Sequence, residues 1–337
     1  MPLDPLILNT NKHLPTHLTA IFVGGTSGIG LYTLLALATH CPNPTIYIIG
    51  RSHSAGTRIL SDLKALNAAG TYIFIPSDVS LIKNVDSVCK QILEKEQYVN
   101  LVFLSTGVMS SGTETAEGLH EPASLILHSR TRFILNLLPL LRAAPLGSPK
   151  RVVSVLAGTK EGSMDATDDL QCRHVKVTQM IAMRSFAASM VTLSLESCAK
   201  RAPDVGFVHW FPGPVRSGFA RGDGLLKRLI RGIIVLLGWL VFIPEKVCGE
   251  RGLWVGTVDG FGGRGKGGEK GSDGEVGSGV YCVNEKGDVG GEAVVGVLKK
   301  LRKEGKGEIV WKHVVGEFLR ITGVESLHQK EEEEVEK

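Results

Sequence analysis

The chain has 337 residues, of which 43% are hydrophobic and 21% are charged, a composition typical of a globular protein and not of a disordered one. Its formal net charge of +4 is small for this length and is not gathered in a basic stripe, so we expect no nucleic acid partner. The six cysteines form no C-x-x-C pair and no metal-ligand spacing, and the N-terminus lacks the pattern of a signal peptide, which together indicate a cytoplasmic protein without a metal site.

Apolar runs alternate with segments of helical period over the first two-thirds of the chain. Nearly continuous apolar strands separated by amphipathic helices indicate a parallel sheet that is covered on both faces. With right-handed crossovers, the pattern predicts an α/β fold with a doubly wound, Rossmann-like parallel sheet. We expect this single domain over residues 17–325, after an N-terminal extension at 1–16. The expected strands are 18–25, 45–51, 71–80, 100–107, 151–158 and 205–214.

The most apolar stretch of the chain is KRLIRGIIVLLGWLVFIPEK, residues 227–246. Its uncharged part, from Gly232 to Ile243, is too short to span a bilayer. We expect a lid at 225–246 that packs over an apolar substrate pocket. The alternative interpretation is peripheral membrane contact through 227–246, because cations precede the apolar run.

The last eighty residues change in composition. Residues 256–279 are rich in glycine and charge, so they are expected to form a flexible surface loop. A final strand is expected at 279–285, followed by closing helices at 297–305 and 309–323. Residues 326–337 form an acidic run that we expect to be a disordered tail.

The stretch FVGGTSGIG, residues 22–30, lies between an expected strand and an expected helix and places glycines at positions 24, 28 and 30. Gly24 allows the tight turn, Gly28 removes a side chain that would block a pyrophosphate, and Gly30 permits close packing of the helix on the strand. The helix N-terminus offers unsatisfied N–H groups and a positive dipole end to phosphates. This context predicts a dinucleotide-binding loop.

The second expected strand ends in Arg51 and not in an acidic residue. A carboxylate there would bind the ribose 2′-hydroxyl of NAD, whereas an arginine suits a 2′-phosphate, so the cofactor is predicted to be NADP. Asp78 and Val79 end the third strand, where the carboxylate can accept the adenine amino group. A turn or helix-capping role is the alternative for Asp78.

In this order, the glycine-rich turn, Arg51, Asp78-Val79, Gly107 and Pro212-Gly213 resemble the short-chain dehydrogenase/reductase family over about residues 17 to 250. The segments SVLAGTKEG, NLLPLL and MVTLSLESCAKRAPDVGFVHWFPGPVRSG resemble fungal secondary-metabolism members more narrowly. The resemblance implies an NADP site, and it is compatible with a homo-oligomer, since many members are homo-oligomers. The implied cofactor-binding residues are Gly24, Thr26, Ser27, Gly28, Ile29, Gly30, Arg51, Asp78, Val79, Gly107, Pro212, Gly213 and Val215.

The catalytic pattern of that family is not present. The family uses a tyrosine with a lysine four residues later, and no tyrosine of this chain has such a lysine. The matching positions are Thr178 and Ala182, and Ala157 stands where the family has a serine. Lys176, with His174, is the better candidate for a replacement proton donor, because it lies close to the vacant tyrosine position. Further candidates are Asp168, Asp169, His128 and His209.

Three functions follow from a well-marked cofactor cleft without the usual acid and base. The first is an NADP-dependent oxidoreductase that acts on an apolar small molecule in secondary metabolite biosynthesis. The second is a non-redox isomerase or cyclase that uses the same cleft to hold a reactive intermediate. The third is a catalytically silent, cofactor-binding accessory protein, since one fold hosts many functions.

Overall fold

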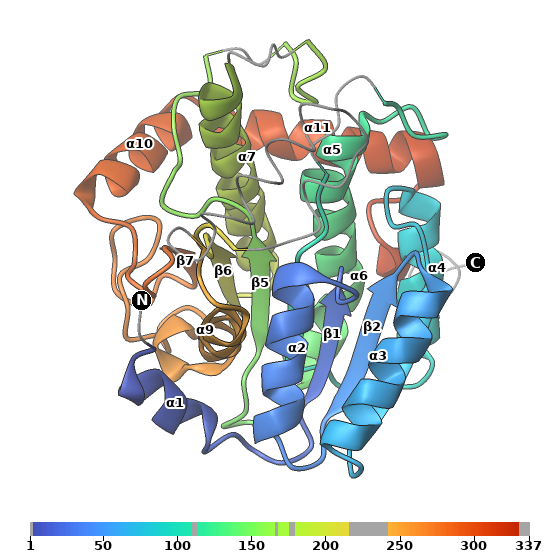
Figure 1. Ribbon diagram of the computed structural model, residues 1–337. Coiled ribbons are helices and arrows are strands. Elements are labelled where there is room, and N and C mark those ends of the chain that lie inside the picture. The colour runs from blue at the N-terminus through green and yellow to red at the C-terminus, as the bar shows by residue number, and fades with distance from the viewer. Residues whose placement is uncertain (1–2, 109–112, 166–167, 175–178, 216–241, 330–337) are drawn as a thin grey trace, which may run out of the picture.

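The computed structural model describes residues 3–108, 113–165, 168–174, 179–215 and 242–329 (Figure 1). Within them, seven strands form one parallel sheet in the order β3-β2-β1-β4-β5-β6-β7. The strands are β1 (Thr19–Val23), β2 (Thr45–Gly50), β3 (Thr71–Pro76), β4 (Leu101–Leu104), β5 (Arg151–Val155), β6 (Gly206–Trp210) and β7 (Val280–Val283).

The order of the strands creates a switch point between β1 and β4. From β1 the chain first adds β2 and β3 on one side, and it then crosses back to add β4 to β7 on the other side. All residues of β1, β4, β5 and β6 are buried, as expected for strands with helices on both faces. The predicted doubly wound α/β fold is therefore confirmed, and a ligand crevice is expected at the switch point.

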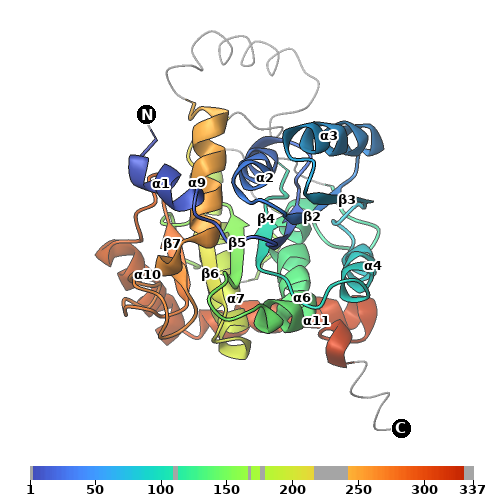
Figure 2. The same ribbon diagram turned by 90° about the horizontal axis from the view of Figure 1, so that it is seen from below.

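Two layers of helices cover the sheet (Figure 2). Helices α2, α3 and α9 lie on one face with the smaller apolar cluster, and α4, α6, α7 and α11 lie on the other face with the larger one. The helices are α1 (Pro5–Asn11), α2 (Gly28–His40), α3 (His53–Leu66), α4 (Ile82–Leu93), α5 (Glu121–Ala123), α6 (Ser129–Ala143), α7 (Met180–Arg201), α9 (Glu245–Thr257), α10 (Glu292–Lys303) and α11 (Lys306–Thr322). A π-helix at Ser124–His128 leads into α6, and a 3-10 turn at Asp259–Phe261 follows α9.

The N-terminal segment is part of the fold. The Nδ2 atom of Asn11, at the end of α1, donates to the backbone oxygen of Glu250 (2.9 Å) and to its Oε2 atom (2.8 Å). Both Oε atoms of Glu250 also lie 3.0 Å from Nε2 of His40. These buried contacts join α1, α2 and α9, so the described part of the N-terminal extension packs against the domain.

The two edges of the sheet are finished differently. β3 is partly exposed and ends at Pro76, a residue that edge strands tolerate because it has no N–H to donate. At β7, the backbone N–H groups of Ser272 and Gly290 donate to the carbonyl oxygens of Val280 and Cys282, both at 2.8 Å. The outer edge of β7 is therefore bonded to its own chain.

The glycine-rich segment 256–279, predicted as a flexible surface loop, is instead packed into the fold. A Cβ atom on Gly271 would lie 1.8 Å from Ser278 Oγ, and one on Gly267 would lie 2.0 Å from Tyr281 Oη. Phe261 is fully buried, and Lys270 forms an antiparallel bridge with Val276. The glycines permit close approach of backbone segments, so their number does not indicate flexibility here.

The expected acidic tail begins later than residue 326. Leu327 is 7% exposed, and its N–H donates to Oδ1 of Asn136 on α6 (3.0 Å). His328 Nε2 lies 2.8 Å from the backbone oxygen of the same residue. The segment up to residue 329 is thus docked, and the rest of the tail lies outside the described residues.

The expected lid was 225–246, and the alternative membrane-contact segment was 227–246. The part of both that precedes residue 242 lies outside the described residues. The described end enters α9 through Pro244, which occupies the N-cap position. Among the helices that the structure describes, none is both long enough and apolar enough to cross a membrane.

Candidate cofactor and substrate site

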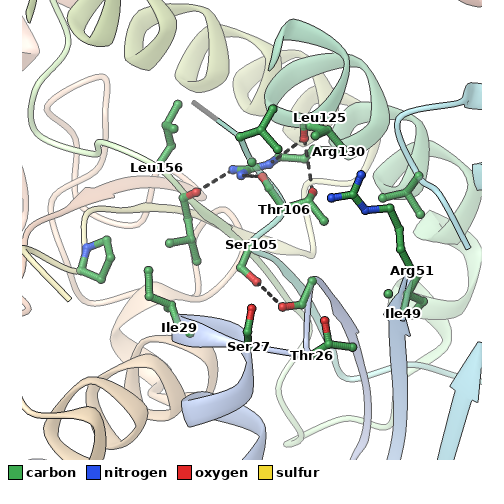
Figure 3. Close-up of a pocket in the computed structure, with 18 of the residues that line it drawn as sticks. Thr26, Ser27, Ile29, Ile49, Arg51, Ser105, Thr106, Leu125, Arg130 and Leu156 are labelled. Carbon is green, nitrogen blue, oxygen red and sulfur yellow. Dashed lines mark hydrogen bonds between the residues drawn. The ribbon is translucent and has the colours of Figure 1, made fainter. Parts of the chain in front are cut away.

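A cavity of about 650 Å³ lies at the carboxyl ends of the strands, at the switch point between β1 and β4 (Figure 3). Six loops line it, each following one of the strands β1 to β6. All of the predicted cofactor-binding residues except Gly30 lie on its wall: Gly24, Thr26, Ser27, Gly28, Ile29, Arg51, Asp78, Val79, Gly107, Pro212, Gly213 and Val215. The fold thus brings together residues that are almost 200 positions apart in the sequence.

The glycine-rich turn has the backbone shape that a pyrophosphate requires. Gly24 (φ +91°) and Gly28 (φ +60°) are both in the left-handed region. A Cβ atom on Gly30 would lie 2.5 Å from Ser105 Oγ and 2.7 Å from the oxygen of Gly24, so only glycine lets α2 pack this closely on β4. The first turn of α2 has no acidic residue and no side-chain cap, so its N–H groups face the cavity without a competing anion.

Arg51 lies at the rim of the cavity, after β2. Its side chain is 63% exposed, and its Nη1 atom is 3.9 Å from Oε1 of Glu121. An exposed ion pair at this distance contributes little to stability, so the guanidinium can turn toward a phosphate at small cost. The position fits a 2′-phosphate on the adenosine side of the cleft.

Asp78 forms hydrogen bonds within the turn after β3 and lies on the cavity wall. Its Oδ1 atom accepts a hydrogen bond from the N–H of Ser80 (3.1 Å), and its backbone oxygen accepts one from Nδ2 of Asn84 (2.9 Å). It therefore shapes the turn after β3 and also lies on the cavity wall beside Val79. The second carboxylate oxygen is available for an adenine amino group.

The inner end of the cavity contains a buried arginine that the sequence reasoning missed. Nε of Arg130 donates to the backbone oxygen of Leu125 (3.3 Å), and its Nη1 atom donates to Ser154 Oγ (2.9 Å) and the backbone oxygen of Val155 (2.8 Å). Its Nη2 atom donates to the backbone oxygen of Thr106. Figure 3 shows Arg130 beside Leu125 and Thr106, and its partners Thr106, Ser154 and Val155 lie at the ends of β4 and β5. Burial lowers the pKa of Arg130 from 12.5 to about 9, so the guanidinium stays protonated at neutral pH.

The π-helix at Ser124–His128 supplies part of this arrangement. Besides the bond from Arg130, the oxygen of Leu125 accepts one from Thr106 Oγ1 (3.4 Å). Such wide turns are rare and occur often at functional sites. Here the bond from Thr106 to Leu125 connects the loop after β4 to the wide turn that precedes α6.

Behind the cavity, Ala157 is anchored to a buried polar cluster. Its N–H donates to Nε2 of His209 (3.1 Å), and Nδ1 of His209 lies 3.1 Å from Oε1 of Glu161. Thr192 Oγ1 also donates to this Oε1 (2.8 Å). Burial raises the pKa of Glu161, but the hydrogen bond from His209 acts in the opposite direction, and the net pKa lies below its usual range.

This cluster has the composition of a metal site but not its geometry. Ligand atoms of Glu161, His209 and Cys282 lie within 4.8 Å of one another. Because Nε2 of His209 accepts from a backbone N–H, the ring proton must be on Nδ1, the atom that faces Glu161. A metal bound at Nδ1 would require the ring proton on Nε2. The Nε2–H group would then face the backbone N–H of Ala157, and neither donor would have an acceptor. The cluster therefore fits a hydrogen-bonded anchor and does not fit a metal.

None of the predicted proton donors that the structure describes lines the cavity. Lys176 and Thr178 lie outside the described residues. The N–H of His174 donates to Oδ2 of Asp169 (3.1 Å) in a local turn. His128 is fully buried, with Nε2 at 3.2 Å from Nε2 of His313. Together with Asp168 and His209, these described candidates are not among the residues that line the cavity.

Comparison with known proteins agrees with this geometry. The KR domain family matches residues 19–121. Oxidoreductase AN1596 of Emericella nidulans is 38% identical over 88% of this chain and 91% of its own length, and short-chain dehydrogenase/reductase SAT2 of Stachybotrys chartarum is 27% identical over 94% and 96%. Among solved structures, the Pseudomonas aeruginosa RhlG/NADP active-site complex has a TM-score of 0.55, with 17% identity over 74% of this chain and 92% of that one. L-sorbose reductase from Gluconobacter frateurii, complexed with NADPH and L-sorbose, also scores 0.55, with 14% identity over 73% and 92%.

Proposed function

The chain belongs to the short-chain dehydrogenase/reductase family of oxidoreductases, and from this we propose that it is an NADP-dependent enzyme that acts on an apolar small molecule in secondary metabolism. The observation that carries the proposal is the cavity in which the glycine-rich turn, the N-terminus of α2 and Arg51 meet. The identity with oxidoreductases of fungi, among them AN1596, favours a role in fungal small-molecule chemistry.

The residues of the cavity fit NADP in three parts. The glycine-rich turn and the free N–H groups of α2 would hold the pyrophosphate, since a Cβ atom has no room at Gly30 and no side chain intrudes at Gly28. Arg51 would bind the 2′-phosphate, and Asp78 would accept the adenine amino group. When bound, the reduced cofactor supplies a hydride. Two proteins of the same fold hold NADP or NADPH, which supports the assignment.

The inner wall is suited to a substrate with a large apolar part. Leu125, Val155, Leu156, Phe211 and Val215 contribute apolar surface there. Such a wall excludes water from the reacting group and strengthens electrostatic interactions inside the cavity. The substrate is thus held by shape and desolvation in the region where the family would place its tyrosine and serine.

For the role of proton donor, our proposal keeps Lys176 and Thr178. Ala157 has no hydroxyl to hold a substrate oxygen, and its methyl side chain is 1% exposed. A threonine hydroxyl is a much weaker acid than a phenol, so Lys176 is the stronger candidate of the two.

Titration of the purified protein with NADPH, followed by nicotinamide fluorescence, tests the proposal. We expect saturable binding of NADPH that is tighter than binding of NADH. Absence of saturable binding of either cofactor would refute the oxidoreductase proposal.

A non-redox isomerase or cyclase is the second candidate, and the methyl group at Ala157 favours it, because a cleft without the family's acid can still hold a reactive intermediate. Metabolite profiling after deletion of the gene would supply the accumulating intermediate. Turnover of that intermediate without consumption of NADPH would favour this second function over the first.

A further inference from the structure

Arg130 is a buried cation whose charge is not neutralised by a carboxylate in the part of the chain that the structure describes. The residue is 3% exposed, and its partners are three backbone oxygens and the hydroxyl of Ser154. Desolvation by burial is what lowers its pKa. Because a buried charge is normally paired, an unpaired one on a cavity wall points to an anionic ligand.

Two other buried arginines show what is special about Arg130. Arg132, two positions later, donates to both carboxylate oxygens of Asp86 at 2.7 Å and to three further oxygens, so its charge and all five N–H groups are satisfied. Arg151 bonds the backbone oxygens of Val255 and Val258 without an ion pair, but it lies at the opposite end of β5. Of the three, Arg130 alone lines the cavity within the described residues.

The hydrogen bonds of Arg130 leave one donor unused. A guanidinium has five N–H groups, one on Nε and two on each Nη. The described partners account for Nε–H, both protons of Nη1 and one proton of Nη2. The second proton of Nη2 is available, on a side chain that four bonds hold rigidly in place. A fixed donor with a full charge is a pre-organised site for an oxygen anion.

The surroundings limit where this anion comes from. Arg51 follows β2, and β1 and β4 separate it from the end of β5, where Arg130 lies. The cofactor phosphates are assigned to the Arg51 side and to the N-terminus of α2, so the inner cation is left for the substrate. Two of the lining residues that Arg130 bonds through their backbone oxygens, Leu125 and Val155, have apolar side chains.

We propose that Arg130 forms an anion subsite for the substrate: it binds a carboxylate or enolate oxygen carried by an otherwise apolar molecule. The inference rests on the proposed function, because that function places the cofactor phosphates elsewhere in the cavity. It narrows the substrate class to apolar acids and to enolisable dicarbonyl compounds. It also supplies a positive charge near the reacting centre of a site in which Ala157 offers no hydroxyl.

The experiment compares benzoate with benzamide, two probes of similar shape that differ in charge. Their affinities are measured by calorimetry on the NADPH-saturated protein, since the reduced nicotinamide ring is uncharged and does not itself attract a carboxylate. We expect benzoate to bind at least about tenfold more tightly, as for a charge-assisted hydrogen bond in a dry site. Equal affinities overturn the proposal. If NADPH does not bind, the proposed function is wrong. The affinities of benzoate and benzamide are then compared on the free protein, and tighter binding of benzoate still supports the anion subsite, whereas equal affinities refute it.

Substitution assigns the preference to a residue. Arg130→Gln removes the charge and keeps some hydrogen bonding, so benzoate should lose its advantage while NADPH affinity changes little. The matched control is Arg151→Gln, which removes another buried, unpaired cation far from the cavity and should keep the full preference. A preference retained in Arg130→Gln refutes the assignment. Should that variant fail to fold, Arg130→Lys takes its place: the preference should fall several-fold without vanishing, and a value equal to that of the parent protein contradicts the proposal.

Discussion

The backbone N–H of Ala157 donates to Nε2 of His209 at 3.1 Å, and this one bond fixes the proton of the imidazole on Nδ1. Nδ1–H then points to Glu161. The ring therefore links the loop after β5 to a buried carboxylate through two hydrogen bonds. This hydrogen bond holds the loop that carries the lining residue Leu156, although neither Ala157 nor His209 lines the cavity itself.

This tautomer leads to a prediction about metals. Glu161, His209 and Cys282 resemble a ligand set by residue type, yet the Nδ1 proton blocks coordination. Added zinc and treatment with a chelator should both leave the melting temperature unchanged, measured by differential scanning calorimetry. A rise in melting temperature with zinc, lost again in His209→Gln, would show that the ring changes tautomer and that the cluster binds metal.

Arg51→Asp should weaken NADPH binding by at least about tenfold and favour NADH in relative terms, because a carboxylate replaces the partner of the 2′-phosphate. Fluorescence titration with both cofactors measures the ratio of affinities. Arg58→Asp is the matched control, since Arg58 is exposed on the neighbouring helix α3 and does not line the cavity. An unchanged ratio in Arg51→Asp would remove this residue from the cofactor site.

Gly28→Val should abolish NADPH binding and leave most of the fold intact. The isopropyl group would occupy the space of the pyrophosphate, and φ of +60° is unfavourable for valine. We expect a stability loss of about 1–3 kcal/mol from backbone strain, measured by chemical unfolding.

Gly147→Val separates these two effects. Gly147 has φ of +80° and open space around its Cβ position, in the turn before β5. This variant should show a similar strain cost and unchanged NADPH affinity. If both variants bind NADPH like the parent protein, the turn at Gly28 does not hold the pyrophosphate.

Stability should fall in weak acid because of His128. Burial, with a smaller contribution from His313 beside it, lowers the pKa of His128 from 6.5 to about 3. The unfolded chain therefore binds a proton below pH 6.5 that the folded chain does not bind until about pH 3. Above pH 6.5 this ring does not reduce the free energy of unfolding. Below pH 6.5 the free energy of unfolding decreases as the pH falls, by roughly 3 kcal/mol near pH 4.

Urea unfolding of the parent protein and of His128→Phe over this pH range tests the assignment. The variant keeps a buried ring but cannot be protonated there, so its free energy of unfolding should depend less on pH between 6.5 and 4. Parallel pH profiles for the two proteins would mean that another group causes the acid sensitivity.

The strands and the cofactor turn could be predicted because their signals are local. Four apolar residues in a row at 20–23 and glycines at fixed spacing after them carry the information within one segment. The helix boundaries were less accurate: the closing helix expected at 297–305 is α10, which begins five residues earlier, at Glu292. The chemistry of the catalytic positions stays a prediction, because it depends on Lys176 and Thr178.

Arg130 could not be found in this way because its burial depends on distant partners. A charged residue in SRTRFILNLLPLL is normally placed on the solvent side of an amphipathic helix. The one local signal was its spacing of four and seven residues from Ile134 and Leu137, which are buried. The oxygens that hold it belong to the ends of β4 and β5, so only the assembled sheet reveals the site.

The closed edge of β7 limits how this protein can assemble. Val280 and Cys282 direct their outer carbonyl oxygens to N–H groups of the same chain, and Val283 forms a bridge with Val289. A strand of a second subunit therefore cannot pair with this edge, because the outward carbonyl oxygens already accept hydrogen bonds. Edge-to-edge aggregation through β7 is blocked for the same reason. A homo-oligomer that continued the described sheet would have to use the β3 edge.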